Sequence, residues 1–312
     1  MLSQFNIAKF TFHLKAEDSI QLPSYKGSTF RGAFGHTFRK IVCALRKDSC
    51  DKCLLKETCI YSYVFETPIP KDSQKMKKYT HSPHPFILEP PFEGKRSYSP
   101  GDSIIFNLVL IGKSIDYLPY FIYTFIELGK KGIGKGKGKF LLEEVRDSQD
   151  SLIFFSHGNK FNNTFSRLYF NDMKSQDSCT KIKVSFLAPA RIKYDGKRTS
   201  NLEFHVLIRN LLRRISILSY FHCKEELDLS FSNNIIEKAK NIKSASKDLR
   251  WLDWERYSSR QNTRMKMGGI TGDIIYEGEF DSFSPFIKLG EYIHVGNGTS
   301  FGLGKYEMEI LE

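Results

Sequence analysis

Hydrophobic residues in the first half of the chain follow first a strand-like period and then a helical one. Residues 5–14, FNIAKFTFHL, are apolar at nearly every second position, which predicts a half-buried strand. Residues 28–45 place their apolar side chains at helical spacing. After them the pattern predicts a strand at 84–91, a strand from Asp102, an apolar helix, a glycine-rich loop and a last strand at 136–145. The predicted order is therefore β-α-β-β-α-β.

The second half repeats this order. The pattern predicts a strand at 181–192, a strongly amphipathic helix at 202–221, and a long hairpin at 256–280 that turns at Gly268-Gly269. A helix, a second glycine-rich loop and a strand then end the sequence.

A short internal match links the two halves. GKGKFLLEEV at 136–145 aligns with GLGKYEMEIL at 302–311, so that two glycines, a lysine and an aromatic residue fall in register. We therefore expect an α+β fold of two tandem ferredoxin-like (RRM-like) domains, at 1–147 and 179–312. The polar segment 148–178 is the expected connector, with room for a hairpin of its own. Such sheets often bind single-stranded RNA, although a fold alone does not fix a function.

Charge narrows the class of partner. The 312 residues include 47 Lys and Arg against 35 Asp and Glu, a net charge of +12. This excess favours a polyanionic partner, and an ordinary basic surface is the alternative. No stretch approaches the ~18 apolar residues of a membrane helix, and the N-terminus lacks the apolar core of a signal peptide. We expect a cytoplasmic protein without a membrane partner.

The loop GKKGIGKGKGKF, at 129–140, combines glycine with dense positive charge. It lacks the Ser or Thr that a nucleotide phosphate loop needs after its lysine, because Phe140 follows Lys139. It also opens a strand, whereas a dinucleotide-binding loop opens a helix. Lys135, Lys137 and Lys139 are therefore candidates for contacts with an RNA backbone. The alternative is a glycine-lined crossing between packed elements.

Further basic residues fall where the pattern predicts loops and exposed faces. The candidates for RNA binding are Lys26, Arg31 and Arg39 early in the chain, and Arg256 and Arg260 in the predicted hairpin. Tyr257, Trp251 and Trp254 lie near the hairpin candidates, and aromatic rings among cations suit stacked bases and phosphates.

Four of the six cysteines lie within one short segment, at about 43–60. Cys43, Cys50, Cys53 and Cys59 follow the first predicted helix. A reducing compartment disfavours disulfides, and four thiolates at this spacing suit one tetrahedral structural ion. We expect zinc, with an iron–sulfur cluster as the alternative.

Taken together, these segments make the sequence resemble a family of CRISPR-associated endoribonucleases that cut repeat RNA, within the RAMP superfamily. The resemblance covers most of the chain. It depends on LPSYKGSTFRGAFGHTFRKIV, HPFILEPP, ELGKKGIGKGKGKF, LAPARI, RYSSRQ and, above all, LGEYIHVGNGTSFGLGKYEM at 289–308.

The resemblance implies a substrate, a reaction and an RNA-binding loop. The substrate would be precursor CRISPR RNA, cut without a metal ion by attack of the 2′-hydroxyl, which leaves a 2′,3′-cyclic phosphate and a 5′-hydroxyl. A CRISPR effector complex is a further partner that it implies. The loop would contact RNA through Gly296, Gly298, Gly302, Gly304 and Lys305. The chain departs from the family's glycine motif where Asn297 fills an apolar slot and three residues separate Gly298 from Gly302.

This chemistry needs a base, an acid and a positive charge near the phosphate. Helical spacing puts His36 opposite the apolar stripe of the 28–45 helix, one turn before Lys40. His36 is our first candidate for acid or base, with Lys40 or Arg39 stabilising charge; a merely solvated histidine is the alternative. The resemblance assigns Tyr25 a supporting place upstream. His294 is the rival, although its apolar neighbours suit a packed residue.

Two other functions compete. The chain would be a non-catalytic RNA-binding RAMP subunit of an effector complex if its RNA groove lacked a histidine. A general RNA-processing or tRNA-binding protein is the weaker alternative.

Overall fold

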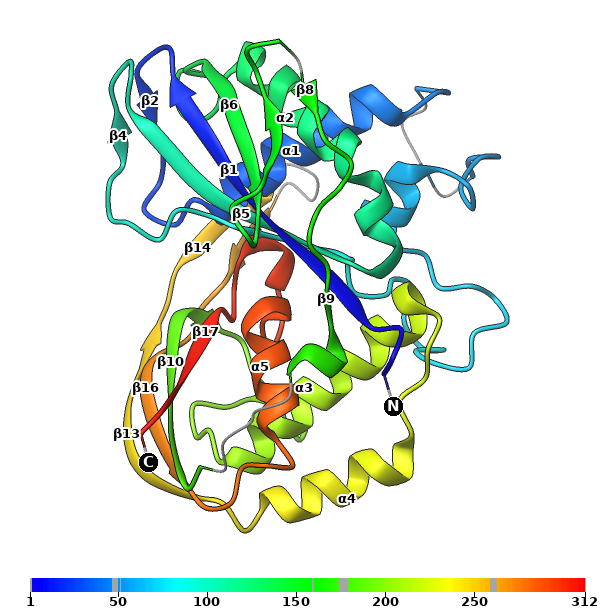
Figure 1. Ribbon diagram of the computed structural model, residues 1–312, viewed down its shortest axis with the longest axis vertical. Coiled ribbons are helices and arrows are strands. Elements are labelled where there is room, and N and C mark those ends of the chain that lie inside the picture. The colour runs from blue at the N-terminus through cyan, green and yellow to red at the C-terminus, as the bar shows by residue number, and fades with distance from the viewer. Residues whose placement is uncertain are drawn as a thin grey trace. The chain divides into compact units, whose positions relative to one another are not determined.

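The computed structural model describes residues 2–46, 50, 52–158, 160–173, 179–258 and 263–311. The chain forms two compact units. The N-terminal unit comprises Asn6–Leu168 together with Phe221–Cys223, and the C-terminal unit comprises Met1–Phe5, Tyr169–Tyr220 and Lys224–Glu312. Both units combine helices with antiparallel sheets, which confirms the predicted α+β class (Figure 1).

The sheet of the N-terminal unit has the strand order β3-β5-β1-β6-β7-β8, with β1 between β5 and β6 (Figure 1). Its strands are β1 (Asn6–Ala16), β3 (Phe86–Glu89), β5 (Ser103–Ile111), β6 (Phe140–Asp147), β7 (Leu152–Phe155) and β8 (Lys160–Phe161). Helix α1 (Gly27–Val42) lies between β1 and β3 in sequence, and helix α2 (Leu118–Lys131) joins β5 to β6. A short ribbon pairs β2 (Ile20–Gln21) with β4 (Ser97–Tyr98). The element order is therefore the predicted one.

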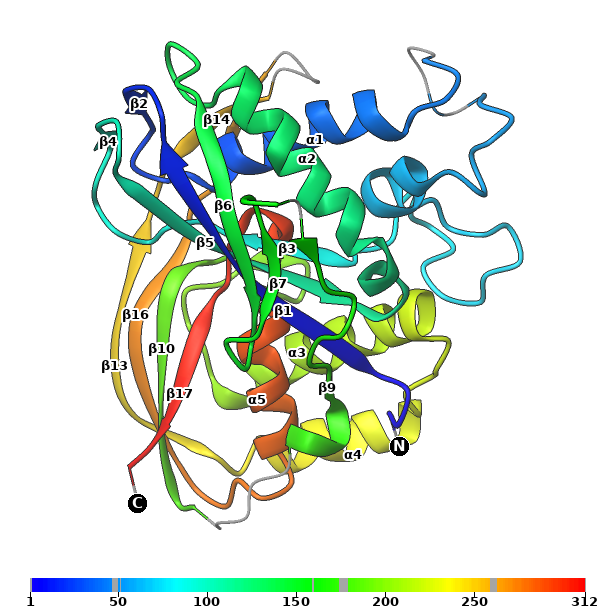
Figure 2. The same ribbon diagram turned by 45° about the horizontal axis from the view of Figure 1, so that its top comes forward.

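Phenylalanine side chains hold α1 against α2 and the sheet. Phe30, Phe34 and Phe38 recur every fourth residue, so they share one face of α1, and all three are fully buried. The Phe34 ring stacks on Phe121 of α2 at 5.0 Å, and Phe30 meets Phe106 of β5 at 5.2 Å. Burying each such side chain contributes about 1.5–3 kcal/mol. This stripe therefore fixes which face of α1 remains outside, and Figure 2 shows α1 and α2 side by side.

Helix α1 is shorter than the predicted 28–45. It ends at Val42, and Cys43 turns to an extended conformation with φ −82° and ψ 97°. Leu45, the last residue of the predicted helix, therefore lies beyond the observed one and is 41% exposed.

The C-terminal unit has a four-stranded sheet in the order β13-β16-β10-β17, and the four strands run side by side in Figure 2. The strands are β10 (Lys181–Ala190), β13 (Lys243–Leu252), β16 (Gly269–Glu277) and β17 (Tyr306–Ile310), and the helices are α3 (Phe204–Leu218), α4 (Leu229–Ala239) and α5 (Ser284–Ile293). Each unit thus places its first strand between its third and its fourth. The minor strands β11 (Lys193–Tyr194) and β12 (Lys197–Arg198) pair with each other, whereas β9 (Leu168–Tyr169) pairs with β1 in the first sheet.

The hairpin prediction was wrong about the turn. Strand β14 (Glu255–Ser258) pairs with β15 (Thr263–Lys266), and the strands before and after this pair, β13 and β16, also pair with each other. Gly268 lies between β15 and β16 instead, and Gly269 is the first residue of β16. A Cβ on Gly269 would come within 2.8 Å of the Ala190 carbonyl oxygen, so this glycine permits a close approach to β10 rather than a turn.

The predicted connector contains the expected hairpin. Strands β7 and β8 pair through Phe154 and Phe161, and β7 also pairs with β6, so this part of the connector extends the N-terminal sheet. Over the described residues, none of the helices combines the length and apolarity that crossing a membrane requires.

Candidate functional site

His36 lies on the exposed face of α1, as its helical spacing predicts. Its neighbours Phe34 and Phe38 point into the core, whereas His36 and Lys40, one turn later, are exposed. Gly32, one turn earlier, is also exposed, and a Cβ placed on it would meet no atom within 4 Å. The imidazole and the ammonium group thus share an open surface on which a phosphate can approach both.

Arg31 and Arg39 flank this surface but are committed to aromatic rings. The Arg31 guanidinium lies 5.1 Å from the centre of the Phe65 ring, and that of Arg39 lies 5.6 Å from Tyr61. Arg31 Nη2 also donates to His84 Nε2 at 2.8 Å. Since a guanidinium can only donate, His84 Nε2 accepts in this contact. His84 could not be recognised from the sequence, because 53 residues separate it from Arg31.

Tyr25 and Lys26 precede α1, where Tyr25 is half-buried and Lys26 is buried. Burial raises the pKa of Tyr25, so its phenol stays protonated at neutral pH and can donate but not accept a proton. Lys26 is fully buried, and its Nζ donates to the carbonyl oxygens of Glu93 (2.6 Å) and Pro91 (3.4 Å). Burial lowers the pKa of Lys26, and nearby Glu93 partly opposes this. The predicted RNA contact of Lys26 is therefore corrected to a structural one.

The lysine-rich loop between α2 and β6 turns its glycines inward and its lysines outward. Cβ atoms on Gly134 and Gly138 would lie 2.2 and 2.4 Å from the carbonyl oxygens of Gln21 and Ser19. These glycines therefore permit a close crossing of the chain, which was the structural alternative. Lys135, Lys137 and Lys139 are exposed, and within the described residues their ammonium groups form no ion pair.

The C-terminal glycine loop buries both of its predicted ionisable site residues. His294 is fully buried, has φ +60°, and places Nδ1 3.1 Å from the Leu303 carbonyl oxygen. Lys305 is 8% exposed and donates to the Glu291 carbonyl oxygen at 2.8 Å. These positions argue against His294 as a catalytic group and against Lys305 as an RNA contact, because neither side chain reaches solvent. Gly296, Gly298, Gly302 and Gly304 all have positive φ.

Arg214 supports the start of this loop. Its Nε donates to the Ile293 carbonyl oxygen, at the C-terminal end of α5, over 2.8 Å. A cation there interacts favourably with the helix dipole. Burial nevertheless lowers the pKa of Arg214 to about 9, since a charge in this environment loses its hydration.

Two further candidates fall on the β14–β15 hairpin. Arg256 belongs to β14, and only its backbone is described. Arg260 lies outside the described residues.

The four clustered cysteines are free and half-buried. Cys43 ends α1, and Cys50 and Cys53 form a turn in which the Cys53 N–H donates to the Cys50 carbonyl at 3.2 Å. Within the described part of the chain, no three Cys, His, Asp or Glu side chains come close enough together to hold a metal ion.

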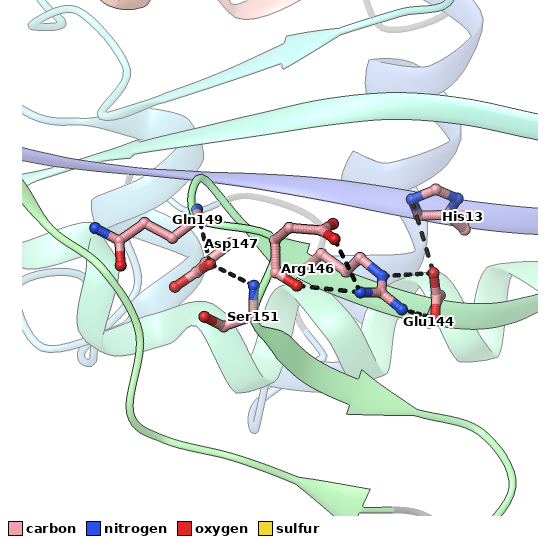
Figure 3. A network of polar contacts seen from close by, with 7 residues as sticks. His13, Glu144, Arg146, Asp147, Gln149 and Ser151 are labelled. Atoms are coloured by element: carbon pink, nitrogen blue, oxygen red, sulfur yellow. Dashed lines mark hydrogen bonds and ion pairs between the residues drawn. The ribbon is translucent and has the colours of Figure 1, made fainter.

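The sheet face of the N-terminal unit opposite to α1 and α2 carries a polar network that the sequence analysis did not single out. Figure 3 shows the Glu144 carboxylate between the ring of His13 (3.9 Å) and the guanidinium of Arg146 (2.8 Å). The Arg146 hydrogen bond lowers the pKa of Glu144. His13 follows the polar positions of the alternating segment 5–14, so its face was predictable. Glu144 comes from β6, which only the pairing of β1 with β6 reveals.

This network neutralises the sheet face. Lys9 pairs with Glu89 at 3.4 Å, and Asn107 donates to the same carboxylate at 3.0 Å. Lys9 and Arg146, cations of this face that could have bound phosphates, are thus paired with carboxylates. RNA contacts are better sought on α1 and in the loops.

Two family models together match most of the chain. One, described as an N-terminal domain, matches residues 5–164. The other, described as CRISPR-associated endoribonuclease Cas6, matches residues 184–306, which include α3, α5 and the C-terminal glycine loop. Residues 184–306 of this chain therefore match the Cas6 family, and the structure shares the Cas6 fold. This confirms the resemblance that the glycine loop and its companion segments indicated.

Other proteins match this chain over most of its length. An uncharacterized protein of Archaeoglobus fulgidus is 26% identical over 294 residues, which cover 92% of both chains. Thermus thermophilus Cas6 matches with a TM-score of 0.56 at 13% identity, over 97% of this chain and 98% of that one. A Cas6 product complex matches with a TM-score of 0.60 at 14% identity, over 97% and 100%. A RAMP protein binding different RNA substrates gives 0.50 at 10% identity, over 97% and 99%. At these identities the solved structures establish a shared fold.

Proposed function

We propose that this chain is an endoribonuclease that cuts precursor CRISPR RNA within its repeats, and that each unit is a ferredoxin-like domain. The observation that carries the proposal is the open surface of α1, where His36 and Lys40 lie one turn apart and Gly32 leaves room for substrate. The match of residues 184–306 to the Cas6 model supports the reaction class, and this surface supplies groups suited to it. The protein would act in the cytoplasm and pass its products to a CRISPR effector complex.

The proposed reaction needs no metal ion. A base removes the proton of the ribose 2′-hydroxyl, and the 2′-oxygen attacks the adjacent phosphorus. The bond from phosphorus to the 5′-oxygen breaks, and an acid protonates that oxygen. The products are a 2′,3′-cyclic phosphate and a 5′-hydroxyl. A histidine suits either proton transfer, because its ordinary pKa lies near neutrality.

The remaining groups divide the other tasks. Lys40 would stabilise the added negative charge on the phosphate in the transition state. Tyr25, whose raised pKa keeps the phenol protonated, would act as a hydrogen-bond donor or proton donor and not as the base. Arg39 and Arg31, packed on aromatic rings, would hold the surface of α1 and its surroundings in position.

The test is cleavage of the cognate repeat RNA in excess EDTA. Wild type is compared with His36→Ala and with the control His157→Ala, which removes another exposed histidine. A parallel substrate carries a 2′-deoxy sugar at the cut site. The proposal expects cutting that survives EDTA, stops on the deoxy substrate and falls at least ~100-fold in His36→Ala alone.

Other outcomes would redirect the assignment. Cutting that survives in His36→Ala would remove His36 from the reaction. Tight RNA binding without any cutting would identify a non-catalytic RAMP subunit, and equal binding of unrelated hairpins or tRNA would indicate a general RNA-binding protein.

We also propose that Cys43, Cys50, Cys53 and Cys59 hold a structural metal ion, zinc in the first place and an iron–sulfur cluster as the alternative. Four free thiols in one short segment are a donor set suited to zinc. A backbone hydrogen bond from Cys53 to Cys50 links two of these cysteines. The ion would draw the thiols together as it binds, since metal binding and local folding are coupled. The ion would fix the segment after α1 without entering the reaction.

A further inference from the structure

The two glycine loops share one hydrogen-bonded frame. Each begins with a residue of positive φ that ends a helix: Gly132 (+81°) after α2 and His294 (+60°) after α5. The next residue is buried and donates its N–H to the last glycine of the loop, Ile133 to Gly138 (2.9 Å) and Val295 to Gly304 (3.1 Å).

The correspondence continues through the rest of each loop. A glycine of positive φ comes next, Gly134 in one loop and Gly296 in the other. The backbone N–H of the residue after this glycine donates to a carbonyl oxygen in the segment that follows the first strand of its unit. These donors are Lys135, which bonds to Gln21 at 3.0 Å, and Asn297, which bonds to Arg191 at 3.1 Å. At the end of each loop, one carbonyl oxygen accepts hydrogen bonds from the N–H groups of two successive residues. In the first loop, the Lys139 carbonyl accepts from Glu17 and Asp18. In the second, the Lys305 carbonyl accepts from Leu187 and Ala188. The internal sequence match therefore reflects two copies of one structural element.

The two copies differ in length and in charge. The C-terminal copy contains an additional short turn, Thr299–Phe301, and exposes no cation among its described residues from 294 to 305, because Lys305 is buried. The N-terminal copy exposes Lys135, Lys137 and Lys139. The frame needs none of these three side chains, since its hydrogen bonds use only the backbone.

Lys137 adds a second observation. Its φ is +53°, a left-handed conformation in which glycine or asparagine is far less strained than lysine. Strain of this kind commonly persists where a side chain has a functional task. In the corresponding region of the other copy, the positive φ values belong to glycines.

We propose that the N-terminal loop is a second RNA contact, one that grips the sugar-phosphate backbone without regard to sequence, while the uncharged C-terminal loop contacts RNA through close backbone approach. This inference rests on the proposed RNA-cutting function for the identity of the ligand. Three ammonium groups on a rigid frame act as point charges toward phosphates, and phosphate contacts add affinity without distinguishing bases. The loop therefore raises affinity for every RNA equally.

The test compares two triple variants of the full chain that remove the same charge. Lys135→Ala/Lys137→Ala/Lys139→Ala alters the loop. The control, Lys71→Ala/Lys77→Ala/Lys78→Ala, alters three exposed lysines of another loop. Binding is measured by fluorescence anisotropy over a range of salt concentrations. One probe is a labelled repeat RNA with a 2′-deoxy sugar at the cut site, and the other is a shuffled RNA of the same length.

For the loop variant, the slope of log affinity against log salt should fall by about 2 for both RNAs, at about 0.7 for each lost phosphate contact. At about 0.1 M salt this corresponds to roughly 100-fold weaker binding. The preference for repeat over shuffled RNA should not change, and the control variant should keep the wild-type slope. An unchanged slope in the loop variant, an equal loss in both variants, or a selective loss for the repeat would overturn the inference.

A single substitution separates function from folding. Lys137→Gly should raise the thermal midpoint by relieving the left-handed lysine while lowering the salt slope by about 0.7. A lowered midpoint would contradict the strain argument, and an unchanged slope would contradict the phosphate contact.

The outcomes also separate this inference from the proposed function. Wild-type cutting with an unchanged slope in the loop variant refutes only the loop. RNA binding without cutting, with the reduced slope, refutes only the catalytic proposal. Failure of the wild type to bind either RNA refutes both.

Discussion

Replacing Gly132 by alanine should destabilise the N-terminal unit far more than replacing Gly136, four residues later in the same loop. Both glycines have positive φ, +81° and +85°, so both substitutions incur a backbone cost of at least about 1–2 kcal/mol, and Gly132, with ψ 163°, also lies in a region that is essentially restricted to glycine. They differ in their surroundings. A Cβ on Gly132 would lie 1.9 Å from the Lys137 carbonyl oxygen, where ordinary contact begins at 3.4 Å, whereas a Cβ on Gly136 meets nothing within 4 Å.

The additional cost of Gly132→Ala follows from what must move. The Lys137 carbonyl belongs to the turn closed by the hydrogen bond from the Ile133 N–H to Gly138 (2.9 Å), and Ile133 is only 2% exposed. Displacing the turn strains that hydrogen bond and the burial of Ile133. We expect a total loss of about 3–4 kcal/mol for Gly132→Ala and about 1–2 kcal/mol for Gly136→Ala.

Urea unfolding followed by far-ultraviolet circular dichroism measures the difference. With a slope near ~2 kcal/mol/M, the two variants should differ in unfolding midpoint by about 1 M. Both tryptophans, Trp251 and Trp254, lie in the C-terminal unit, so their fluorescence reports that unit and serves as an internal control. An equal loss of stability in the two variants would refute the claim that the close approach of the Lys137 carbonyl requires a glycine at position 132.

Four further outcomes follow from the structure. Gly32→Ala, on the exposed face of α1 with no atom near its new Cβ, should gain about 0.5–1 kcal/mol in thermal unfolding; a loss would mean that this face is covered. Lys26→Ala should cost about 2–4 kcal/mol, because it removes the donor to Glu93 and leaves a cavity, yet it should leave the salt slope of RNA binding intact. In Asp147, burial raises the carboxyl pKa but the N–H groups of Ser166, Ser151 and Gln149 outweigh it, so the net pKa is lowered. The contribution of the Asp147 charge to the free energy of unfolding is therefore complete above the pKa of an unfolded aspartate, about 3.9. It is lost as the pH falls below that value. At pH 7 the free energy of unfolding of Asp147→Asn should be about 1–2 kcal/mol below that of the wild type, and this difference should disappear in acid. A difference independent of pH would exclude this charge effect. Native mass spectrometry of the protein purified without chelator should find about one metal ion per chain, lost in Cys50→Ser but not in Cys179→Ser, and a metal-free wild type would exclude the proposed site.

Local patterning predicted the elements with strong periodicity. The alternation of residues 5–14 and the phenylalanine spacing of α1 gave β1 and the buried face of the helix, because each depends on a single element facing one core. Strand β13 and helix α4 were not predicted. Most of β13 is exposed, so it lacks an apolar stripe, although Asp228 caps α4 by accepting from the N–H groups of Ser230 and Phe231 and could have marked its start.

The candidate site divides in the same way. His36 and Lys40 could be placed together because both lie on one helix, where 3.6 residues complete each turn. Lys26, His294 and Lys305 could not be recognised as buried, because their partners are carbonyl oxygens brought close by the fold. The pairing of Arg31 with His84 likewise joins residues that are distant in the chain.

The sequence by itself determined the order of elements in the N-terminal unit, the polar face of α1, the duplicated glycine loop and the resemblance to CRISPR-associated endoribonucleases. Only the tertiary structure decided which cations remain in water. The glycines of the N-terminal loop bring backbone against backbone and leave Lys135, Lys137 and Lys139 outside, whereas the C-terminal loop folds Lys305 onto a carbonyl oxygen. Charge and spacing are written in the sequence, but exposure depends on what the rest of the chain packs against each side chain.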